Sequence, residues 1–292
     1  MLDNFAVFIL THGRPDNVKT YATLQKQGYT GDVYFIIDNE DKTAEQYRKR
    51  YGDKVIMFDK AEIAARFDEA DNFQDRRTIT HARNASYEIA KKLGIRYFVQ
   101  LDDDYTSFRF RYDANLKYNP VYRCSNLDKL FNAILDFYKS IPAATVAIGQ
   151  GGDFIGGKDS TTGGHLWLKR KSMNSFFCDT SRRVNFVGRM NEDVCTYVTL
   201  GNKGHLFFSF FNVSLEQSES QSSAGGITET YLKYGTYVKS FYTVMFAPSC
   251  VKVHPMGGNT LGRIHHKINW QKAVPCIVSE EYRKKSQIAH EK

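Results

Sequence analysis

The sequence predicts an α/β fold in which helices flank a mixed, mainly parallel sheet. Three observations support this: short apolar runs alternate with amphipathic segments in the first third of the chain, several runs end in polar clusters, and glycines close the helical segments. Strands separated by helices are expected to be parallel, since each connection crosses the sheet. The 292 residues, 42% of them hydrophobic, suffice for one large core, so we expect a single domain over residues 1–292.

The first third of the chain alternates strands and helices. The apolar run Phe5–Leu10 predicts the first strand, and Asp16 or Asn17 can cap a helix that Gly28 closes. A later helix is indicated over residues 76–93, where apolar residues recur at spacings of three and four before a glycine. The other elements expected here are strands at 33–37, 55–58 and 97–101 and a helix near 43–51.

The second half of the chain is less regular. A helix at 127–140 and a strand at 146–149 lead into glycine-rich segments at 150–157 and 161–164. Neither segment has the spacing of a Walker or dinucleotide-binding motif, so we interpret both as loops that border a site. The remaining expectations are apolar runs at 172–177 and 184–187, a helix at 194–201, a strand at 204–211, a polar mobile segment at 217–226 and a helix at 228–241.

The apolar run at 97–101 ends in three consecutive carboxylates, Asp102, Asp103 and Asp104. Carboxylates gathered at a strand exit repel one another and lose hydration unless a cation neutralises them. Their oxygens suit Mg²⁺ or Mn²⁺. Alternate side chains of an extended chain share a face, so Asp102 and Asp104 are expected to point together. A solvated acidic turn is the alternative interpretation.

Two other predicted strands also end in polar residues. Thr11, His12, Gly13 and Arg14 follow the first strand, and Asp38 follows the second. In parallel sheets, ligands bind outside the carboxyl ends of the strands. The convergence of these clusters with the aspartate triplet therefore predicts a ligand site at this edge, although Asp38 can also be a turn or helix-capping residue.

Charge and cysteine content narrow the class of protein further. The net charge of +8 suits a polyanionic partner such as nucleic acid, or an ordinary α/β surface. Five scattered cysteines are interpreted as reduced thiols of a cytosolic protein. No apolar stretch approaches the length of a membrane span, so no membrane partner is expected.

Taken together, these motifs resemble the nucleotide-sugar transferases of the GT-A fold. The aspartate triplet stands in place of their Asp-X-Asp motif, residues 191–193 match an acidic pair that opens a helix, and His254 stands where a late histidine often completes the metal shell. Because Pro255 and two glycines follow His254, we expect it on a turn after an apolar strand. More narrowly, the chain resembles the TET-associated glycosyltransferases of bacteriophages, relatives of the base J glucosyltransferase. The shared features are Thr-His-Gly-Arg-Pro at 11–15, Thr-His-Ala-Arg-Asn at 80–84, Gln-Leu-Asp-Asp-Asp-Tyr at 100–105, and Gly151 with Gly152.

This resemblance implies a metal-dependent enzyme that moves a sugar from a UDP-sugar to a hydroxymethylated pyrimidine in phage DNA, 5-hydroxymethylcytosine being preferred, with an inverting outcome favoured. The enzyme would act in the cytoplasm of the infected bacterium. Residues 1 to about 110 would bind the nucleotide sugar, and about 111 to 292 would form the acceptor half. The sequence assigns neither the sugar nor an oligomeric state.

The resemblance also implies roles for individual residues. Asp104 would be the direct ligand of Mn²⁺ or Mg²⁺, Asp102 would contact the ribose or metal-bound water, and His254 would complete the metal shell. Asp103 would face away toward the backbone or a basic neighbour. Arg83 would support the diphosphate or pair with Asp102 or Asp104. The other residues expected at the nucleotide sugar are Thr11, His12, Gly13, Arg14, Asp38, Gly151, Gly152 and Asp153.

The acidic pair that opens the helix at 194–201 supplies the candidate general base. An acceptor hydroxyl needs a carboxylate within hydrogen-bond reach to take its proton. We favour Asp193 for this role, with Glu192 contacting acceptor or sugar hydroxyls. The alternative is that both simply complement the helix dipole, and a retaining enzyme would not need the base. Candidates for contacts to phosphates or DNA are Arg263, His265, His266 and Lys267, of which the two histidines are also alternatives to His254.

Three rival functions predict different behaviour. A transferase that acts on a glycan or protein would be indifferent to DNA. A nucleotidyltransferase would release pyrophosphate, whereas the favoured reaction releases UDP. A DNA-binding module on an inactive transferase fold would keep the basic surface but would not bind a nucleotide with a metal.

Overall fold

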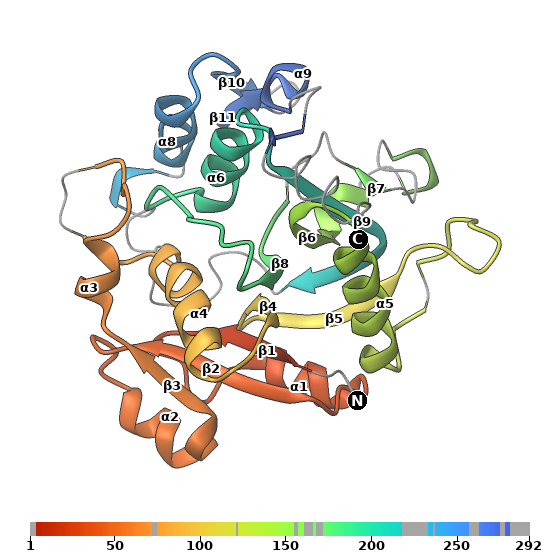
Figure 1. Cartoon of the computed structure of the whole chain (residues 1–292). Coiled ribbons are helices and arrows are strands. Elements are labelled where there is room, and N and C mark those ends of the chain that lie inside the picture. Colours follow the sequence, from red (N-terminus) through yellow and green to blue (C-terminus); the bar gives the residue numbers. More distant parts are fainter. Residues whose placement is uncertain are drawn as a thin grey trace.

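The computed structural model describes residues 4–71, 75–120, 122–154, 157–160, 166–167, 172–217, 233–235, 237–256, 263–274 and 278–280. Within these residues, nine strands form one sheet flanked by helices, and β10 and β11 form a separate ribbon (Figure 1). The sheet order is β3-β2-β1-β4-β8-β6-β9-β5, with β7 beside β9. The strands are β1 (Phe5–Leu10), β2 (Asp32–Asp38), β3 (Val55–Phe58), β4 (Tyr97–Asp102), β5 (Tyr105–Phe110), β6 (Ala143–Gln150), β7 (Leu166–Trp167), β8 (Ser175–Asp179), β9 (Leu206–Gln217), β10 (Val251–Met256) and β11 (Arg263–Ile268).

The expected mixed, mainly parallel sheet is confirmed. Strands β1, β2, β3 and β4 are parallel neighbours, and β6 is parallel to β9. Strand β8 is antiparallel to both β4 and β6, which gives β6 and β9 the same direction as β1. Strands β5 and β7 pair antiparallel with β9. Six strands of this sheet therefore run in one direction and three run against them.

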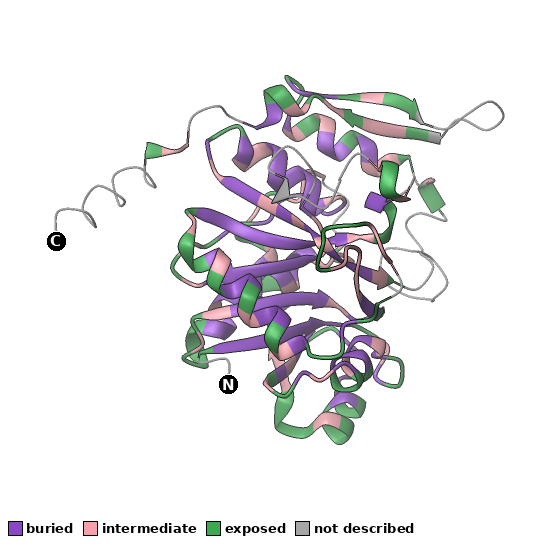
Figure 2. Ribbon diagram, turned by 90° about the vertical axis from the view of Figure 1, so that its right-hand side faces the viewer, coloured by how far each residue is buried: buried purple, intermediate pink, exposed green. Residues whose placement is uncertain are grey.

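Helices cover both faces of the sheet because strand β1 is apolar on both sides. Phe5, Val7 and Ile9 pack in one core with residues of α1 (Lys19–Lys26), α2 (Ala44–Tyr51) and α5 (Leu127–Ser140). The alternate residues of β1 pack in a second core with α3 (Lys60–Ala64), α4 (Thr80–Lys92) and Tyr197 of α6 (Glu192–Gly201). Figure 2 shows the sheet strands as almost continuously buried between these helices.

Several element boundaries differ from the sequence-based expectation. Helix α4 begins at Thr80 rather than at residue 76, because Asp75 accepts the backbone N–H of Arg77 and holds a turn there. Strand β5 was not expected; it directly follows the aspartate triplet. Residues 184–187 form no strand, and β9 continues to Gln217, past its expected end at 211. The glycine-rich segment 161–164 and residues 218–226 of the polar segment lie outside the described residues.

Strand β5 lies at one end of the sheet, and side chains of α1 cover its free edge. Thr20 Oγ1 accepts the backbone N–H of Tyr105, and Thr23 Oγ1 donates to the Tyr105 carbonyl. Gln27 Nε2 donates to the Phe108 carbonyl at 2.9 Å, and Gln27 Oε1 accepts the Phe108 N–H at 2.8 Å. The helix thus completes hydrogen bonds that a further strand would otherwise make.

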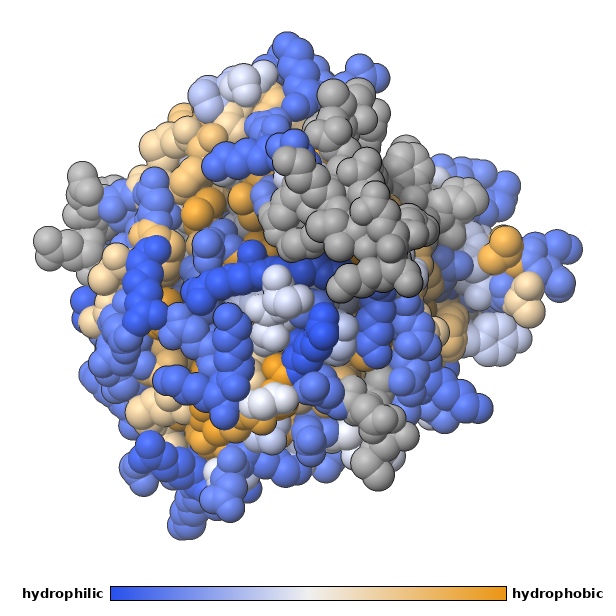
Figure 3. Space-filling view, in the orientation of Figure 1, coloured by the Kyte–Doolittle hydropathy of each residue, from blue (hydrophilic) through white to orange (hydrophobic). Residues whose placement is uncertain are grey.

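The last described elements pack together against α6. Val194 and Val198 of α6 contact Val251 of β10 and Ala273 of α9 (Trp270–Ala273) in a small separate core. Helix α8 (Val238–Phe246) lies alongside and replaces the helix expected at 228–241, whose residues 228–232 are outside the described part. Exposed hydrophobic residues gather over α8 in Figure 3. Among the described helices, none is long and apolar enough to cross a membrane.

Candidate active site

The carboxyl ends of β1, β2 and β4 lie side by side, as the strand order requires. Leu10 of β1 is in register with Ile36 of β2 and with Asp102 of β4. The residues that follow each strand therefore meet at one edge of the sheet. This edge is where parallel α/β sheets bind ligands.

The loop after β1 is fixed by Asp103 and by a tyrosine of α2. Thr11 Oγ1 donates to Asp103 Oδ2 at 2.7 Å, and Arg14 Nη2 lies 3.1 Å from Asp103 Oδ1. Tyr47 Oη lies 2.7 Å from Thr11 Oγ1 and accepts the backbone N–H of Arg14. Burial raises the pKa of Asp103, while Arg14 and Thr11 oppose that rise. Arg14 is therefore the basic neighbour that was expected for Asp103.

The histidine of the loop after β1 contacts the last residue of β2. His12 Nδ1 lies 2.8 Å from Asp38 Oδ2, and the buried Lys60 Nζ lies 3.3 Å from Asp38 Oδ1. Burial alone would raise the pKa of Asp38, but His12 and Lys60 lower it overall. The hydrogen bond to Asp38 in turn raises the pKa of His12. Gly13 has a φ of +73° and donates its N–H to Asp41 Oδ2 at 2.8 Å, which fixes the turn between the two loops.

A buried arginine bridges the triplet to the acidic helix. Arg83 Nη2 donates to Asp102 Oδ1 at 3.1 Å, and Arg83 Nε donates to Glu192 Oε1 at 2.9 Å. Its guanidinium lies over the rings of Phe176 and Phe186 at 5.0 and 5.8 Å. Nη1 is buried and has no hydrogen-bond partner among the described residues. Arg83 thus joins residues 102 and 192, which the chain separates by 90 positions.

The pKa of Asp102 is strongly shifted. Burial raises the pKa of Asp102 to about 7; Arg83 opposes that rise, and the neighbouring carboxylates of Asp104 and Glu192 add to it. Asp104 lies on the turn between β4 and β5, where its Oδ2 accepts a hydrogen bond from Gln217 Nε2 at 3.1 Å. A set of oxygen donors with accumulated negative charge fits a hard divalent cation such as Mg²⁺ or Mn²⁺.

The acidic pair at the start of α6 is buried. Glu192 is held by Arg83, and Asp193 follows in the first turn of the same helix. Asn191 precedes them in a left-handed conformation with φ 52°, and its Nδ2 lies 3.2 Å from His266 Nδ1 of β11. Glu192 therefore takes part in a buried ion pair with Arg83, and Asp193 lies beside it in the same helical turn.

The glycine-rich segment after β6 divides into exposed and buried parts. Gly151 and Gly152 are exposed in η2 (Gly151–Phe154), and a Cβ built on either would meet no atom within 4 Å. Asp153 is buried, and its Oδ2 accepts the backbone N–H of Gln150 at 2.9 Å. Asp153 therefore stabilises the loop, while the two glycines leave open space beside it.

His254 occupies a different environment from the one expected. It lies within β10, opposite His265 of β11, rather than on a turn after a strand. Pro255 does not end the strand, because a two-stranded ribbon has free edges where a missing N–H is tolerated. In the described parts of the chain, no group of three His, Cys, Asp or Glu side chains is gathered as a metal site. Of the expected cation ligands, the structure thus groups Asp102 with Asp104 at one strand exit.

Three residues of this site were missed from the sequence. Tyr47, Asp41 and Lys60 each contact a loop residue after β1 or β2. Tyr47 had the clearest signal, because it is an aromatic residue in the middle of a short helix whose other residues, apart from Tyr51 at its end, are mostly polar or charged. The roles of Asp41 and Lys60 depend on contacts between neighbouring strand exits.

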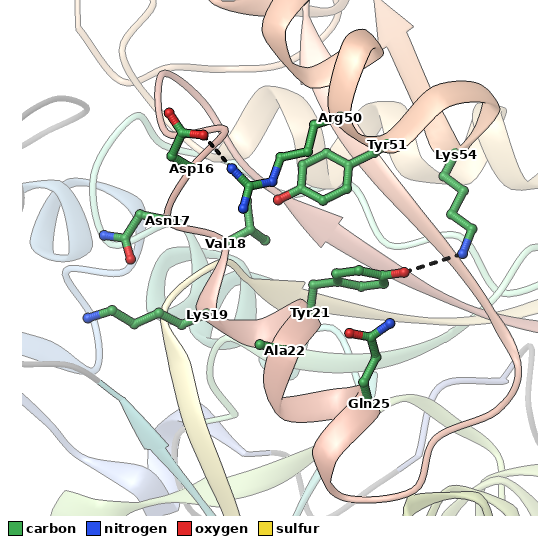
Figure 4. A pocket seen from close by; sticks show the side chains of 10 residues that line it. All are labelled: Asp16, Asn17, Val18, Lys19, Tyr21, Ala22, Gln25, Arg50, Tyr51 and Lys54. Atoms are coloured by element: carbon green, nitrogen blue, oxygen red, sulfur yellow. Dashed lines mark hydrogen bonds and ion pairs between the residues drawn. The ribbon is translucent and has the colours of Figure 1, made fainter.

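A separate cavity of about 660 Å³ lies between α1 and the end of α2 (Figure 4). Tyr21 and Tyr51 line it, with Arg50 paired to Asp16 and Lys54 within 3.4 Å of Tyr21 Oη. None of the nucleotide-sugar residues expected from the sequence lines this cavity. The polar cluster at the strand exits, rather than this cavity, therefore defines the candidate site.

The sheet order and the polar exits of its parallel strands give the chain a GT-A-like α/β fold. The sequence model of the TET-Associated Glycosyltransferase family matches residues 5–226, so the chain belongs to this family.

Solved structures are similar only at a distance. One, described as a mycobacterial protein, has a TM-score of 0.47 and 6% identity, and covers 90% of this chain and 83% of its own. Another, a putative nucleotide-diphospho-sugar transferase from Desulfovibrio desulfuricans G20, has a TM-score of 0.41 and 8% identity, and covers 82% and 99%. No curated protein is similar enough to this chain to count as a match.

Proposed function

We propose that this enzyme transfers a sugar from a UDP-sugar to the hydroxyl group of a 5-hydroxymethylpyrimidine in DNA, with 5-hydroxymethylcytosine as the preferred acceptor. Membership of the TET-Associated Glycosyltransferase family supports the reaction class. The observation that carries the proposal is the bridge from Asp102 through Arg83 to Glu192. It holds the carboxylates of the β4 exit and the helix that bears Asp193 in one rigid unit, as transfer between two substrates requires.

The donor would bind at the exits of β1, β2 and β4. His12 and Asp38 form a polar pair there for the uracil or ribose, and Arg14 is exposed enough to reach a phosphate with its guanidinium fork. Asp104, with Asp102 beside it, would hold Mn²⁺ or Mg²⁺. When bound, the cation would neutralise charge on the diphosphate. Gly151 and Gly152 leave open space for the sugar.

The chemical step is a direct displacement at the anomeric carbon. Asp193 accepts the proton of the acceptor hydroxymethyl group. The oxygen of that hydroxymethyl group then forms the new bond to the anomeric carbon. The bond between that carbon and the diphosphate oxygen breaks, and UDP leaves with the electron pair. Attack on the face opposite the leaving group inverts the configuration. Glu192 is paired with Arg83, and we assign the proton transfer to Asp193, the other carboxylate in the first turn of α6.

The decisive experiment measures UDP release from a panel of UDP-sugars with Mn²⁺. The acceptors are duplexes of one sequence containing 5-hydroxymethylcytosine, 5-hydroxymethyluracil or unmodified bases. We expect release that depends on a hydroxymethylated base. Release that is indifferent to DNA would overturn the acceptor and favour a glycan or protein, and release of pyrophosphate would indicate a nucleotidyltransferase.

The variant Asp193→Asn tests the base. Because general bases contribute about 10²- to 10⁴-fold, we expect kcat to fall at least about 100-fold while binding of the UDP-sugar is retained. Binding is measured by calorimetry in the presence of Mn²⁺. The matched control is Asp53→Asn, an exposed aspartate in η1 (Gly52–Lys54), which should keep the normal rate. A near-normal kcat for Asp193→Asn would exclude it as the base.

A further inference from the structure

The net positive charge of the chain is concentrated beyond the family match. Residues 230–279 contain no Asp or Glu but include six Lys or Arg residues, which account for six of the eight net charges. The family match ends at residue 226. The six are Lys233, Lys239, Lys252, Arg263, Lys267 and Lys272.

The ribbon of β10 and β11 places basic residues on one face. Lys252 is in register with Lys267, and His254 with His265. Side chains directly opposite each other in an antiparallel pair lie on the same face, and every second pair shares that face. Both lysines and His254 are exposed, and His265 is half-buried. In Figure 2 the ribbon projects at the top of the molecule and is exposed or half-buried over most of its length.

The other face fastens the ribbon to the candidate active site. Val251 and Ile268, which are in register, pack against Val194 and Val198 of α6. On the same face, His266 Nδ1 lies 3.2 Å from Asn191, the residue just before Glu192 and Asp193. The basic face is thus held rigidly beside the helix that bears the candidate base.

The surroundings of the ribbon are also suited to an anionic partner. A cavity of about 400 Å³ beside the ribbon is lined by Lys252, Lys267 and Lys272 and by no carboxylate. On the neighbouring helix α8, Phe241 and Met245 are exposed one turn apart, and the Phe241 ring lies 6.4 Å from that of Tyr237. Surfaces that bind nucleic acid commonly combine cations with exposed aromatic residues, and here the two kinds of residue lie on neighbouring elements.

We propose that the basic face of the β10–β11 ribbon docks in the major groove of the duplex that carries the acceptor base. A two-stranded ribbon fits the major groove of B-form DNA, and the 5-substituent of a pyrimidine projects into that groove. Lys252, Lys267 and Lys272 contact phosphates along the groove. This inference rests on the proposed DNA acceptor, and it adds the surface and the groove that present the acceptor to Asp193.

The test is the double variant Lys252→Ala/Lys267→Ala, measured in two ways. Binding of a hydroxymethylcytosine duplex without donor is followed by fluorescence anisotropy at several salt concentrations, and transfer is followed with the duplex and with the free 5-hydroxymethyl-dCMP nucleotide. We expect the duplex Kd and KM to rise about tenfold or more at 0.1 M salt and the log–log salt slope to fall by about 2, since each phosphate contact contributes about 0.9. Transfer to the nucleotide and the KM for UDP-sugar should be unchanged.

Controls separate this inference from the proposed function. Lys91→Ala/Lys92→Ala removes two exposed lysines at the end of α4 and should leave duplex binding unchanged. A double-stranded RNA of the same sequence should bind more weakly, because its major groove is deep and narrow. If the ribbon variant transfers to duplex with an unchanged KM and salt slope, or if the RNA binds equally well, the docking inference is wrong while the function stands. Duplex binding through the ribbon without any transfer would refute the function and keep the docking surface.

Discussion

The exits of β1, β2 and β4 and the β10–β11 ribbon have opposite electrostatic character. The strand exits gather Asp38, Asp41 and the aspartate triplet, whereas the whole segment 230–279 has no carboxylate. Both substrates of the proposed reaction are anionic. The donor can therefore bind at the strand exits only with added cationic groups, and the ribbon can hold a polyanion directly. In the proposed reaction, this contrast would direct DNA to the ribbon rather than to the donor site.

Two arginines, Arg14 and Arg83, neutralise carboxylates at the strand exits, and they differ in exposure. The side chain of Arg14 is 34% exposed, and that of Arg83 is 0% exposed. In the proposed reaction, Arg14 would exchange its partner Asp103 for a phosphate of the donor. Arg83 is fixed between two carboxylates, and its partners raise its pKa further. Adjacent residues of the triplet thus have different tasks: Asp103 holds a loop, and Asp102 belongs to the bridge to α6.

The largest effect is expected from Asp104→Asn, which removes a carboxylate from the acidic strand exits and leaves the basic ribbon unchanged. Mutation of a residue that hydrogen-bonds to a metal ligand typically lowers metal affinity or activity by about 10- to 100-fold. Loss of the ligand itself should therefore lower turnover by at least about 100-fold and weaken Mn²⁺-dependent UDP binding. Duplex binding at the ribbon should stay normal. Turnover and calorimetric UDP titrations with Mn²⁺ check this, with the exposed Asp53→Asn as control. An active Asp104→Asn enzyme would remove Asp104 from the metal site.

A smaller effect, on stability, is expected from Arg83→Ala. This variant leaves Asp102 and Glu192 buried without their cation, which costs about 3–5 kcal/mol, or on the order of 10 °C in Tm for a chain of this length. Arg83→Lys keeps the charge but cannot span both carboxylates, so it should recover only part of the stability. Thermal unfolding by circular dichroism measures both. Equal Tm values for the wild type and Arg83→Ala would show that the bridge does not hold the two halves together.

The smallest effect is expected in the pH dependence of thermal stability. It compares the buried His81 with the exposed His254. Burial of His81 in α4 lowers its pKa to about 4, so the ring donates to Glu69 as a neutral group. The folded pKa is below the unfolded value of about 6.5, so this residue contributes stability above pH 6.5 that is lost as the pH falls toward 4. In melts from pH 7 to 4, His81→Gln should lose a few °C less than wild type. His254→Gln, at an exposed position of the ribbon, should behave like wild type.

The first third of the fold could be predicted because its signals are local. Apolar runs, helical spacing and closing glycines lie within ten to twenty residues of one another, and the convergence of the strand exits at one edge followed from the parallel topology. The bridge could be predicted only in part. Pairing with Asp102 or Asp104 was one of the two roles expected for Arg83, and the structure has the pair with Asp102. The second contact, to Glu192, was not expected, because it depends on β8 running between β4 and β6. His254 was placed on a turn because Pro and Gly follow it, whereas pairing with β11 extends the strand.

The cover that α1 gives to β5 has a consequence for self-association. An uncovered edge strand offers unpaired N–H and C=O groups to any neighbouring chain and invites aggregation. Here Thr20, Thr23 and Gln27 occupy that edge of β5, and the opposite edge of the sheet is the four-residue strand β3. A second copy therefore has little template at either end on which to add a strand.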